Sequence, residues 1–165
     1  MIMNIIKYLF FALLLAFTIS SCKTVSNSAN YSSESIDSII QAQSYSFVPR
    51  TAIPTQMRSV NLSYSFFLKI TPDEISSYLP YFGRAYSAPM NPSEGGIQFT
   101  SKDFSYTIAK KKDKSYEIII ETRDTPRRTK LYITAFDNGS ASVRSQEDSR
   151  QSITFNGNIE FNNKE

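Results

Sequence analysis

Short segments in which apolar and polar residues alternate dominate the second half of this chain. Such alternation is typical of β-strands that bury one face. It predicts strands over residues 97–100, 104–109, 116–122, 130–136, 140–145 and 152–161. Asp137-Asn138-Gly139 separates two of these segments, and Asn and Gly both tolerate the positive φ of a tight hairpin turn. The pattern therefore predicts a run of antiparallel strands joined by short turns.

The first half of the chain shows a helical period and then a further strand. Three isoleucines recur at near-helical spacing and predict a short amphipathic helix over residues 34–44: Ile36, Ile39 and Ile40. Pro49 and Pro54 end this helix and lead into the next element. Between Val60 and Ile70 the alternation of apolar and polar residues returns, which predicts a half-buried strand.

A second helix is predicted directly after that strand. Thr71-Pro72-Asp73-Glu74 combines a cap residue, a proline at the first helical position and an acid that can return a hydrogen bond to the cap. Ile75, Tyr78 and Leu79 would form its apolar side, and Pro80 would end it. The predicted fold class is therefore α+β and mostly β: an antiparallel meander that forms a curved sheet or partial barrel with one or two short covering helices.

The N-terminus carries the features of an export signal. Lys7 precedes an almost purely apolar run over residues 8–19, which closes on Ile19-Ser20-Ser21-Cys22. The run fits the ~7–15 residues of a signal peptide rather than the ~20 of a membrane-spanning helix. Small residues directly before a cysteine resemble the lipobox of bacterial lipoproteins, in which the thiol is acylated and the chain is cut before it. The alternative is a plain secretory signal with an accidental cysteine.

This signal defines the predicted domain organisation. Cys22 is the only cysteine, so it cannot form an internal disulfide, and lipidation gives its thiol a use. We expect residues 1–21 to be a lipoprotein signal peptide and residues 22–33, rich in Ser, Asn and Thr, to be a flexible tether. Residues 34–165 have a length that suits a single α+β domain.

Charge argues against a nucleic-acid partner. The net charge of the whole chain is +3, and removal of the signal brings it closer to zero. A protein that binds phosphate backbones usually shows a clustered basic stripe. The densest basic run, Lys110-Lys111-Lys112, lies between two predicted strands and is interpreted as a solvated hairpin tip. The alternative is contact with an anionic surface.

The residue types available exclude most catalytic chemistry. The chain has no histidine, which excludes histidine triads, histidine metal sites and the commonest general base at neutral pH. Cys22 belongs to the predicted anchor, so thiol catalysis and zinc sites of Cys and His are excluded as well. A carboxylate-based hydrolase remains possible among fifteen acids, although Glu147 and Asp148 are interpreted as a polar turn. We therefore predict a non-enzyme with no cofactor and no metal site.

An aromatic cluster supplies the candidate binding site. Four large side chains follow Pro80 within a few residues: Tyr81, Phe82, Arg84 and Tyr86. Tyr and Arg are enriched in binding surfaces because they supply contact area at low entropic cost. Since Pro80 ends the preceding element and Gly83 frees the backbone, these side chains cannot all point inward, and part of the cluster is predicted to face solvent. The alternative is that the rings plug one end of the sheet, and the two roles are compatible.

Several blocks of this sequence resemble a known family. They are Leu79-Pro80-Tyr81-Phe82-Gly83-Arg84-Ala85-Tyr86, Gly96-Ile97-Gln98-Phe99-Thr100-Ser101, Asn138-Gly139, and Arg150-Gln151-Ser152-Ile153 with Gly157. Together they are similar to an uncharacterised family of bacterial lipoproteins, the domain of unknown function numbered four-two-five-one, over about residues 60–159. The resemblance implies an envelope lipoprotein of Gram-negative bacteria. It implies no catalytic residue.

These observations lead to a primary functional hypothesis and two alternatives. The chain is expected to be a membrane-anchored envelope lipoprotein that binds a glycan, peptide or lipid without catalysis. The first alternative is a structural or assembly protein with a protein partner, and the weaker one is the hydrolase. The outer membrane facing the periplasm is favoured because no acidic run follows Cys22, and surface exposure stays open. Asp37-Ser38-Ile39 also resembles an acceptor for periplasmic O-glycosylation at Ser38.

Overall fold

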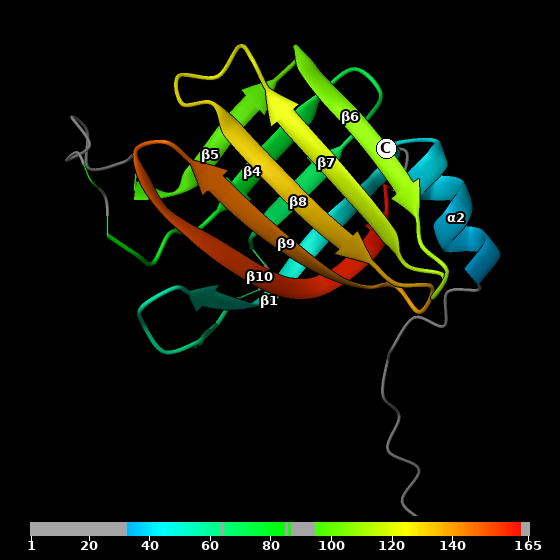
Figure 1. Ribbon diagram of the computed structural model, residues 1–165, viewed down its shortest axis with the longest axis horizontal. Helices are drawn as coiled ribbons and strands as arrows, with labels where there is room; N and C mark the ends of the chain where they lie inside the picture. The colour runs from blue at the N-terminus through cyan, green and yellow to red at the C-terminus, as the bar shows by residue number, and fades with distance from the viewer. Residues whose placement is uncertain (1–32, 64, 85, 87–94, 163–165) are drawn as a thin grey trace, which may run out of the picture.

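The computed structural model describes residues 33–63, 65–84, 86 and 95–162. Within these ranges the chain forms one helix and ten strands (Figure 1). In chain order they are α2 (Ser33–Gln41), β1 (Tyr45–Pro54), β2 (Val60–Asn61), β3 (Phe67–Ile70), β4 (Ile75–Leu79), β5 (Ile97–Ser101), β6 (Phe104–Lys110), β7 (Tyr116–Thr122), β8 (Thr129–Ala135), β9 (Ser140–Glu147) and β10 (Arg150–Phe161). No helix of this described part has the length and apolar character that a membrane crossing requires.

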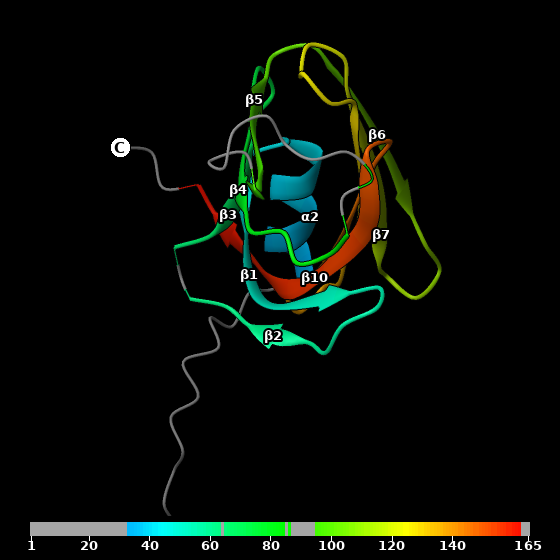
Figure 2. The same ribbon diagram turned by 90° about the vertical axis from the view of Figure 1, so that its left-hand side faces the viewer.

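All ten strands belong to one antiparallel sheet that curves almost into a barrel. The strand order is β5-β4-β3-β1-β10-β9-β8-β7-β6, and β2 adds to β1. β5 and β6 are the two edges, and they follow each other directly in the chain. Figure 2 shows α2 lying within the curve of the sheet. The predicted fold class, mostly β with an antiparallel curved sheet or partial barrel, is confirmed.

The core fills the inside of this curve. Alternate residues of the strands point inward, as the fully alternating burial of β7 and β8 shows. α2 contributes Ile36 and Ile40, both completely buried, as its amphipathic pattern predicts. Tyr106 of β6 lies 3.2 Å from the carbonyl oxygen of Ile40, to which its hydroxyl donates, and 3.2 Å from the hydroxyl of Tyr45. The helix is thus fixed to the interior by apolar packing and by tyrosine hydrogen bonds.

Two hairpin tips lie at the same end of the barrel as α2. Lys111 and Ser115 close the β6–β7 tip, which confirms that the basic run lies at a hairpin turn. In the β8–β9 tip the Phe136 N–H donates to the Ser140 carbonyl, just as the Lys111 N–H donates to the Ser115 carbonyl in the first tip. Each tip has three residues, and the third adopts a positive φ: 64° at Lys114 in the first tip and 83° in the second. Both predicted turns are therefore confirmed.

The predicted second helix is wrong, because residues 75–79 form β4. The Thr71 hydroxyl does bond the backbone N–H of Glu74 at 3.0 Å, as a helix cap would. However, the Thr71 N–H also donates to the Glu74 carbonyl at 2.9 Å, which closes a tight turn between β3 and β4. Ile75 and Leu79 then point inward while Tyr78 is exposed, a period of two rather than of a helix.

The predicted strand over residues 60–70 is only partly correct, and β1 was not predicted. β2 and β3 lie at the two ends of that range. β1 contains two prolines, which normally exclude a central strand. A register shift next to Pro49 accommodates one of them opposite Gly157 of β10. A Cβ on Gly157 would lie 2.1 Å from the Val48 carbonyl oxygen, so only glycine allows this approach.

Candidate functional site

A cavity of about 310 Å³ lies among strand ends and a loop. Figure 1 shows these parts of the chain at the end of the barrel opposite α2. The cavity is formed where β5, β8, β9 and β10 end or begin, together with the loop between β7 and β8. The lining residues are Gly96, Gln98, Phe99, Thr125, Pro126, Arg127, Thr129, Glu147 and Arg150. The lining therefore combines one aromatic ring with amide, hydroxyl and charged groups.

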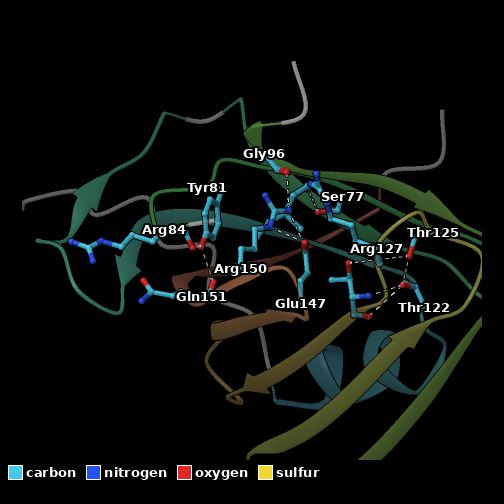
Figure 3. A network of polar contacts seen from close by, with 12 residues as sticks. Ser77, Tyr81, Arg84, Gly96, Thr122, Thr125, Arg127, Glu147, Arg150 and Gln151 are labelled. Atoms are coloured by element: carbon cyan, nitrogen blue, oxygen red, sulfur yellow. Dashed lines mark hydrogen bonds and ion pairs between the residues drawn. The ribbon is translucent and has the colours of Figure 1, made fainter. Parts of the chain in front are cut away.

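A buried ion pair forms one wall of this cavity. Nε and Nη2 of Arg150 each donate to a different carboxylate oxygen of Glu147, both at 2.7 Å. The two side chains are only 7% and 3% exposed, respectively. Nη2 also donates to the Gly96 carbonyl oxygen at 2.9 Å, which links β10 to the start of β5 (Figure 3). This geometry holds the guanidinium group rigidly along one edge.

The β9–β10 hairpin explains why both charges point inward. Glu147 and Arg150 are directly paired across a two-residue turn, Asp148-Ser149, so their side chains lie on the same face of the sheet. A register shift between Arg150 and Ile153 adds a residue to β10. This bulge allows Arg150 and Ile153, which are three apart, both to be buried. The polar turn was predicted, but the burial of Glu147 was not.

Tyr81 covers the face of this guanidinium. The Arg150 guanidinium carbon lies 4.5 Å from the centre of the Tyr81 ring, which is close enough for a cation–π contact. The Tyr81 hydroxyl donates toward the carbonyl oxygens of Arg84 and Gln151, each at 3.0 Å. Burial raises the pKa of Tyr81 above its usual value of 10.0, while the charge of Arg150 acts in the opposite direction. The phenol therefore remains a hydrogen-bond donor at neutral pH.

The predicted aromatic cluster follows β4 rather than a helix, and only part of it joins the ion pair. Tyr81 and Phe82 are half-buried and pack against the core, whereas Arg84 is exposed and Tyr86 is 71% exposed. In Figure 3 the Arg84 side chain points away from Arg150. The expectation that part of the cluster faces solvent is thus confirmed.

Backbone hydrogen bonds attach this segment to the β9–β10 turn. The Tyr86 N–H donates to the Ser149 carbonyl at 2.8 Å, and the Gln151 N–H donates to the Arg84 carbonyl at 3.2 Å. The segment also borders a second cavity, of about 220 Å³, which Gln56, Met57, Gly83, Arg84 and Gln151 line. The aromatic segment therefore lines the second cavity through Gly83 and Arg84 and contacts the main cavity's wall only through the Tyr81–Arg150 contact.

A threonine network shapes the opposite wall of the main cavity. The Thr125 hydroxyl lies 2.6 Å from that of Thr122 and donates to the Arg127 carbonyl at 2.7 Å (Figure 3). The Thr129 N–H donates to the Thr122 hydroxyl at 3.1 Å. These bonds give the β7–β8 loop a defined shape, because its threonine hydroxyls have fixed partners.

Asp124 joins that loop to the β5–β6 turn. Its carboxylate accepts hydrogen bonds from the Ser101 hydroxyl and from the backbone N–H groups of Lys102 and Asp103, the latter two at 2.8 and 3.1 Å. These bonds lower the pKa of Asp124 to about 2. Ionised Asp124 therefore joins the two loops at this end of the barrel, together with the Arg123–Asp103 contact between the same loops.

The other predicted sites lie elsewhere. Ser38 is on the exposed side of α2, at the far end of the barrel from the cavity. Its neighbour Asp37 accepts a hydrogen bond from the Tyr116 hydroxyl at 2.7 Å and pairs with Lys110 at 3.2 Å, and both contacts lower the pKa of Asp37. Cys22, the signal peptide and the tether up to residue 32 lie outside the described residues.

Sequence reasoning missed the charged half of the site. Glu147 was assigned to a turn, and Arg150 was noted only as part of a block that resembles a family. One signal was available, because three of those blocks meet here: Tyr81 bonds Gln151, and Arg150 bonds Gly96. Blocks far apart in the sequence that share a resemblance are candidates for one spatial site.

Comparison with known proteins identifies the family. A crystal structure of a DUF4251 family protein from Bacteroides eggerthii DSM 20697 matches this chain with a TM-score of 0.59 at 10% sequence identity, and the match covers 78% of this chain and 87% of that one. At this identity the likeness establishes a shared fold. No curated protein matches the chain. The family model described as a domain of unknown function, DUF4251, matches residues 27–159. This chain therefore belongs to the DUF4251 family.

Proposed function

We propose that this protein is a lipid-anchored envelope protein whose barrel binds a small ligand, without catalysis, in the cavity opposite α2. The observation that carries the proposal is the Glu147–Arg150 pair, which is buried and yet forms a cavity wall. A buried ion pair contributes little net stability, since desolvation offsets the attraction of the charges. A fixed pair beside a cavity is therefore better explained by recognition than by folding.

Preorganisation supports binding at this place. The Arg150 guanidinium is held by Glu147 at its edge, by Gly96 at Nη2 and by Tyr81 on its face. A group that is already immobile loses little entropy when a ligand arrives. The cavity volume of about 310 Å³ lies near the lower limit of the ~300–1,000 Å³ that is typical of small-molecule sites.

The state of the carboxylates supports a non-catalytic role. Carboxylate-based glycoside hydrolysis needs two carboxyl groups that face one substrate, roughly 5–10 Å apart. Glu147 is the acid that lines the cavity, and both of its oxygens accept bonds from Arg150. Asp124 of the neighbouring loop is committed to the β5–β6 turn. A second acid that could act as general acid or base is therefore lacking in the described cavity wall.

The ligand-binding proposal is tested with the whole chain, purified and incubated with small molecules extracted from the cell envelope. Native mass spectrometry should detect a retained compound. The double variant Glu147→Leu with Arg150→Met keeps the volume of the wall but removes its polarity, and it should retain nothing. If wild type and double variant retain the same compounds, or neither retains any, the cavity is not a ligand site.

The anchor is proposed from the sequence, on the apolar run and the small residues before Cys22. Replacing Cys22 by Ser should release the protein from the membrane fraction, on the periplasmic side of the outer membrane as the favoured location. Cys22→Ser protein that still sediments with salt-washed membranes would contradict lipid anchoring.

A protein partner is the alternative function, and an exposed aromatic cluster favours it. Phe67 of β3 and Tyr78 of β4 are exposed with ring centres 6.0 Å apart, and the half-buried ring of Phe66, just before β3, lies 5.6 Å from that of Tyr78. Cross-linking in the native envelope distinguishes the two functions. A single protein captured by wild type, and lost in Tyr78→Ala but not in the double cavity variant, would favour the alternative.

O-glycosylation at Ser38 is also proposed, on the Asp37-Ser38-Ile39 match. The exposed position of Ser38 on α2 is compatible with modification. Intact-mass measurement of native protein should show a mass above that of the chain, and Ser38→Ala should remove the excess. Equal excess masses in both proteins would exclude this site.

A further inference from the structure

We infer that the cavity between β5, the β7–β8 loop and the β9–β10 hairpin accommodates one ring of a saccharide. The inference rests on the proposed ligand-binding function and concerns the chemical class of the ligand. It depends on three properties of the lining: its mixture of donors and acceptors, its apolar surface and its charge.

The lining offers donors and acceptors side by side. Nη1 of Arg150 makes no hydrogen bond with another described residue, so it is available as a donor. The Glu147 oxygens each accept one bond from Arg150, and a carboxylate oxygen can accept a second. The Gln98 amide both donates and accepts, and its side chain is exposed at the rim. Sugar hydroxyl groups match this mixture because each can donate and accept at once.

The lining also offers an apolar surface of suitable kind. Phe99 of β5 and Pro126 of the β7–β8 loop both line the cavity. Phe99 is half-buried, so one part of its ring packs against the core and is held in place. A pyranose ring has an apolar face of C–H groups between its hydroxyls, and such a face stacks on an aromatic ring. A ligand that carries hydroxyls at its edge and C–H groups on its face satisfies both parts of the lining.

Charge at the Glu147–Arg150 wall favours a neutral ligand over an acid, whereas Arg127 of the β7–β8 loop adds a positive charge elsewhere in the lining. The positive charge of Arg150 is balanced by Glu147 at 2.7 Å, so this wall behaves as a dipole rather than as a cation. A carboxylate or phosphate placed beside Arg150 would also lie beside Glu147, and the like charges would repel each other. A neutral hydroxylated ring avoids this repulsion while using the same hydrogen-bonding groups.

The volume limits the occupant to a small unit. A cavity of about 310 Å³ is close to the lower limit of small-molecule sites, which favours a single small unit as the occupant. Gln98 is exposed beside the cavity, so a longer glycan can extend from the bound ring into solvent. One ring inside and further rings outside is therefore the expected mode.

The experiment uses the whole chain, purified in a detergent without a sugar headgroup. Saturation-transfer NMR screens a panel of neutral hexoses, N-acetylhexosamines and their disaccharides against uronic acids, amino acids, dipeptides and dicarboxylates. Calorimetry then measures the dissociation constant of each compound that binds. We expect a neutral saccharide to bind, with transfer strongest at its C–H face because that face contacts Phe99.

Two matched variants test the position of the ring. Phe99→Ala should raise the dissociation constant at least tenfold, as loss of an aromatic anchor does. Phe67→Ala removes an exposed phenylalanine from the outer face of β3, away from the cavity, and should change the constant less than twofold. Circular dichroism confirms that both variants are folded.

The outcomes separate the ligand class from the function. If only acids, amino acids or peptides bind, and Phe99→Ala weakens them, the cavity is a ligand site but the saccharide inference is wrong. If a saccharide binds equally to wild type and Phe99→Ala, its site lies elsewhere and the inference is wrong. If no saccharide of the panel binds, the inference is likewise overturned, whereas the proposed function fails only if the envelope extract also leaves no retained compound.

Discussion

The two ends of this barrel bury different types of residue. At the α2 end, Ile36 and Ile40 are completely buried, and two short hairpin tips complete the closure. At the opposite end, Glu147 and Arg150 take the buried positions, and a cavity remains between them and the loops. The same barrel thus has apolar side chains of the helix at one end and a charged pair of the sheet at the other.

This difference between buried apolar residues and a buried ion pair indicates which residues stabilise the fold. Burial of apolar side chains stabilises a fold in proportion to the area removed from water. Burial of a charged pair does not, since a pair of apolar residues of similar size is often at least as stable. Mutation at the α2 end is therefore expected to change stability, and paired replacement at the cavity end is expected to change recognition.

The largest effect should come from separating the ion pair. Glu147→Gln leaves the Arg150 charge buried without compensation, and the free energy of unfolding should fall by about 3–5 kcal/mol. The double replacement Glu147→Leu with Arg150→Met should recover most of this loss, because no charge is left to desolvate. Chemical denaturation of the three proteins measures both changes. A double variant as unstable as Glu147→Gln would show that the pair itself stabilises the fold.

A slightly smaller effect is expected at the α2 end. Ile40→Ala creates a cavity beneath the helix and should lower the free energy of unfolding by about 2–5 kcal/mol. Ligand affinity at the far end should stay unchanged. Ile119→Ala on the outer face of β7 is the matched control, and it should cost much less because Ile119 is 37% exposed. If Ile40→Ala abolishes binding while the protein remains folded, the two ends are coupled.

The two hairpin tips at the α2 end allow a smaller test. Lys114 has a φ of 64°, which costs about 1–2 kcal/mol for a residue with a Cβ. Lys114→Gly removes that cost but increases the entropy of the unfolded chain, so a net gain of about 0.5–1 kcal/mol is expected. Lys112→Gly in the same tip, where φ is not positive, should instead destabilise the protein. Thermal unfolding distinguishes the two variants, and equal signs would contradict the prediction.

The smallest effect concerns acidification at the cavity end. The pKa of Asp124 is about 2 in the folded protein, against an ordinary value of 3.8. Because the folded-state pKa is the lower one, ionised Asp124 stabilises the fold above about pH 4, and this contribution is lost as the pH falls toward 2. The stability of wild type should therefore decline more steeply over this window than that of Asp124→Asn. Parallel curves would show that Asp124 does not fix the two loops.

Periodicity in the sequence predicted much of this fold. β7, β8 and β9 alternate without interruption, and the turns beside them contain residues suited to positive φ or to tight reversal, so local signals and tertiary structure agree. The isoleucines of α2 predicted its buried face for the same reason. Partial exposure of the aromatic cluster followed from the same kind of local argument, since Pro80 ends the preceding element, and Tyr86 is the ring that is most exposed.

The errors arose where one local signal fits two structures. Thr71 bonds the Glu74 N–H both in a helix cap and in the observed turn, so the motif could not decide between helix and strand. β1 was hidden by its prolines, whose accommodation depends on Gly157, over a hundred residues away in sequence. The inward position of Arg150 depends on a bulge, which periodicity does not reveal. In each case, pairing between strands determined the structure that forms.

The pairing of β1 with β10 also determines when this chain can fold. Tyr45 lies opposite Phe161, so the contact that joins the two halves of the sheet spans nearly all of the domain. Contacts between residues so distant in sequence form slowly, because the entropic cost of closing a long loop comes before any stabilising interaction forms. The edge of β1 that faces β10 therefore has no partner until the final strand has been synthesised. A chain of this topology therefore keeps one edge of a central strand unpaired until β10 is complete and in place.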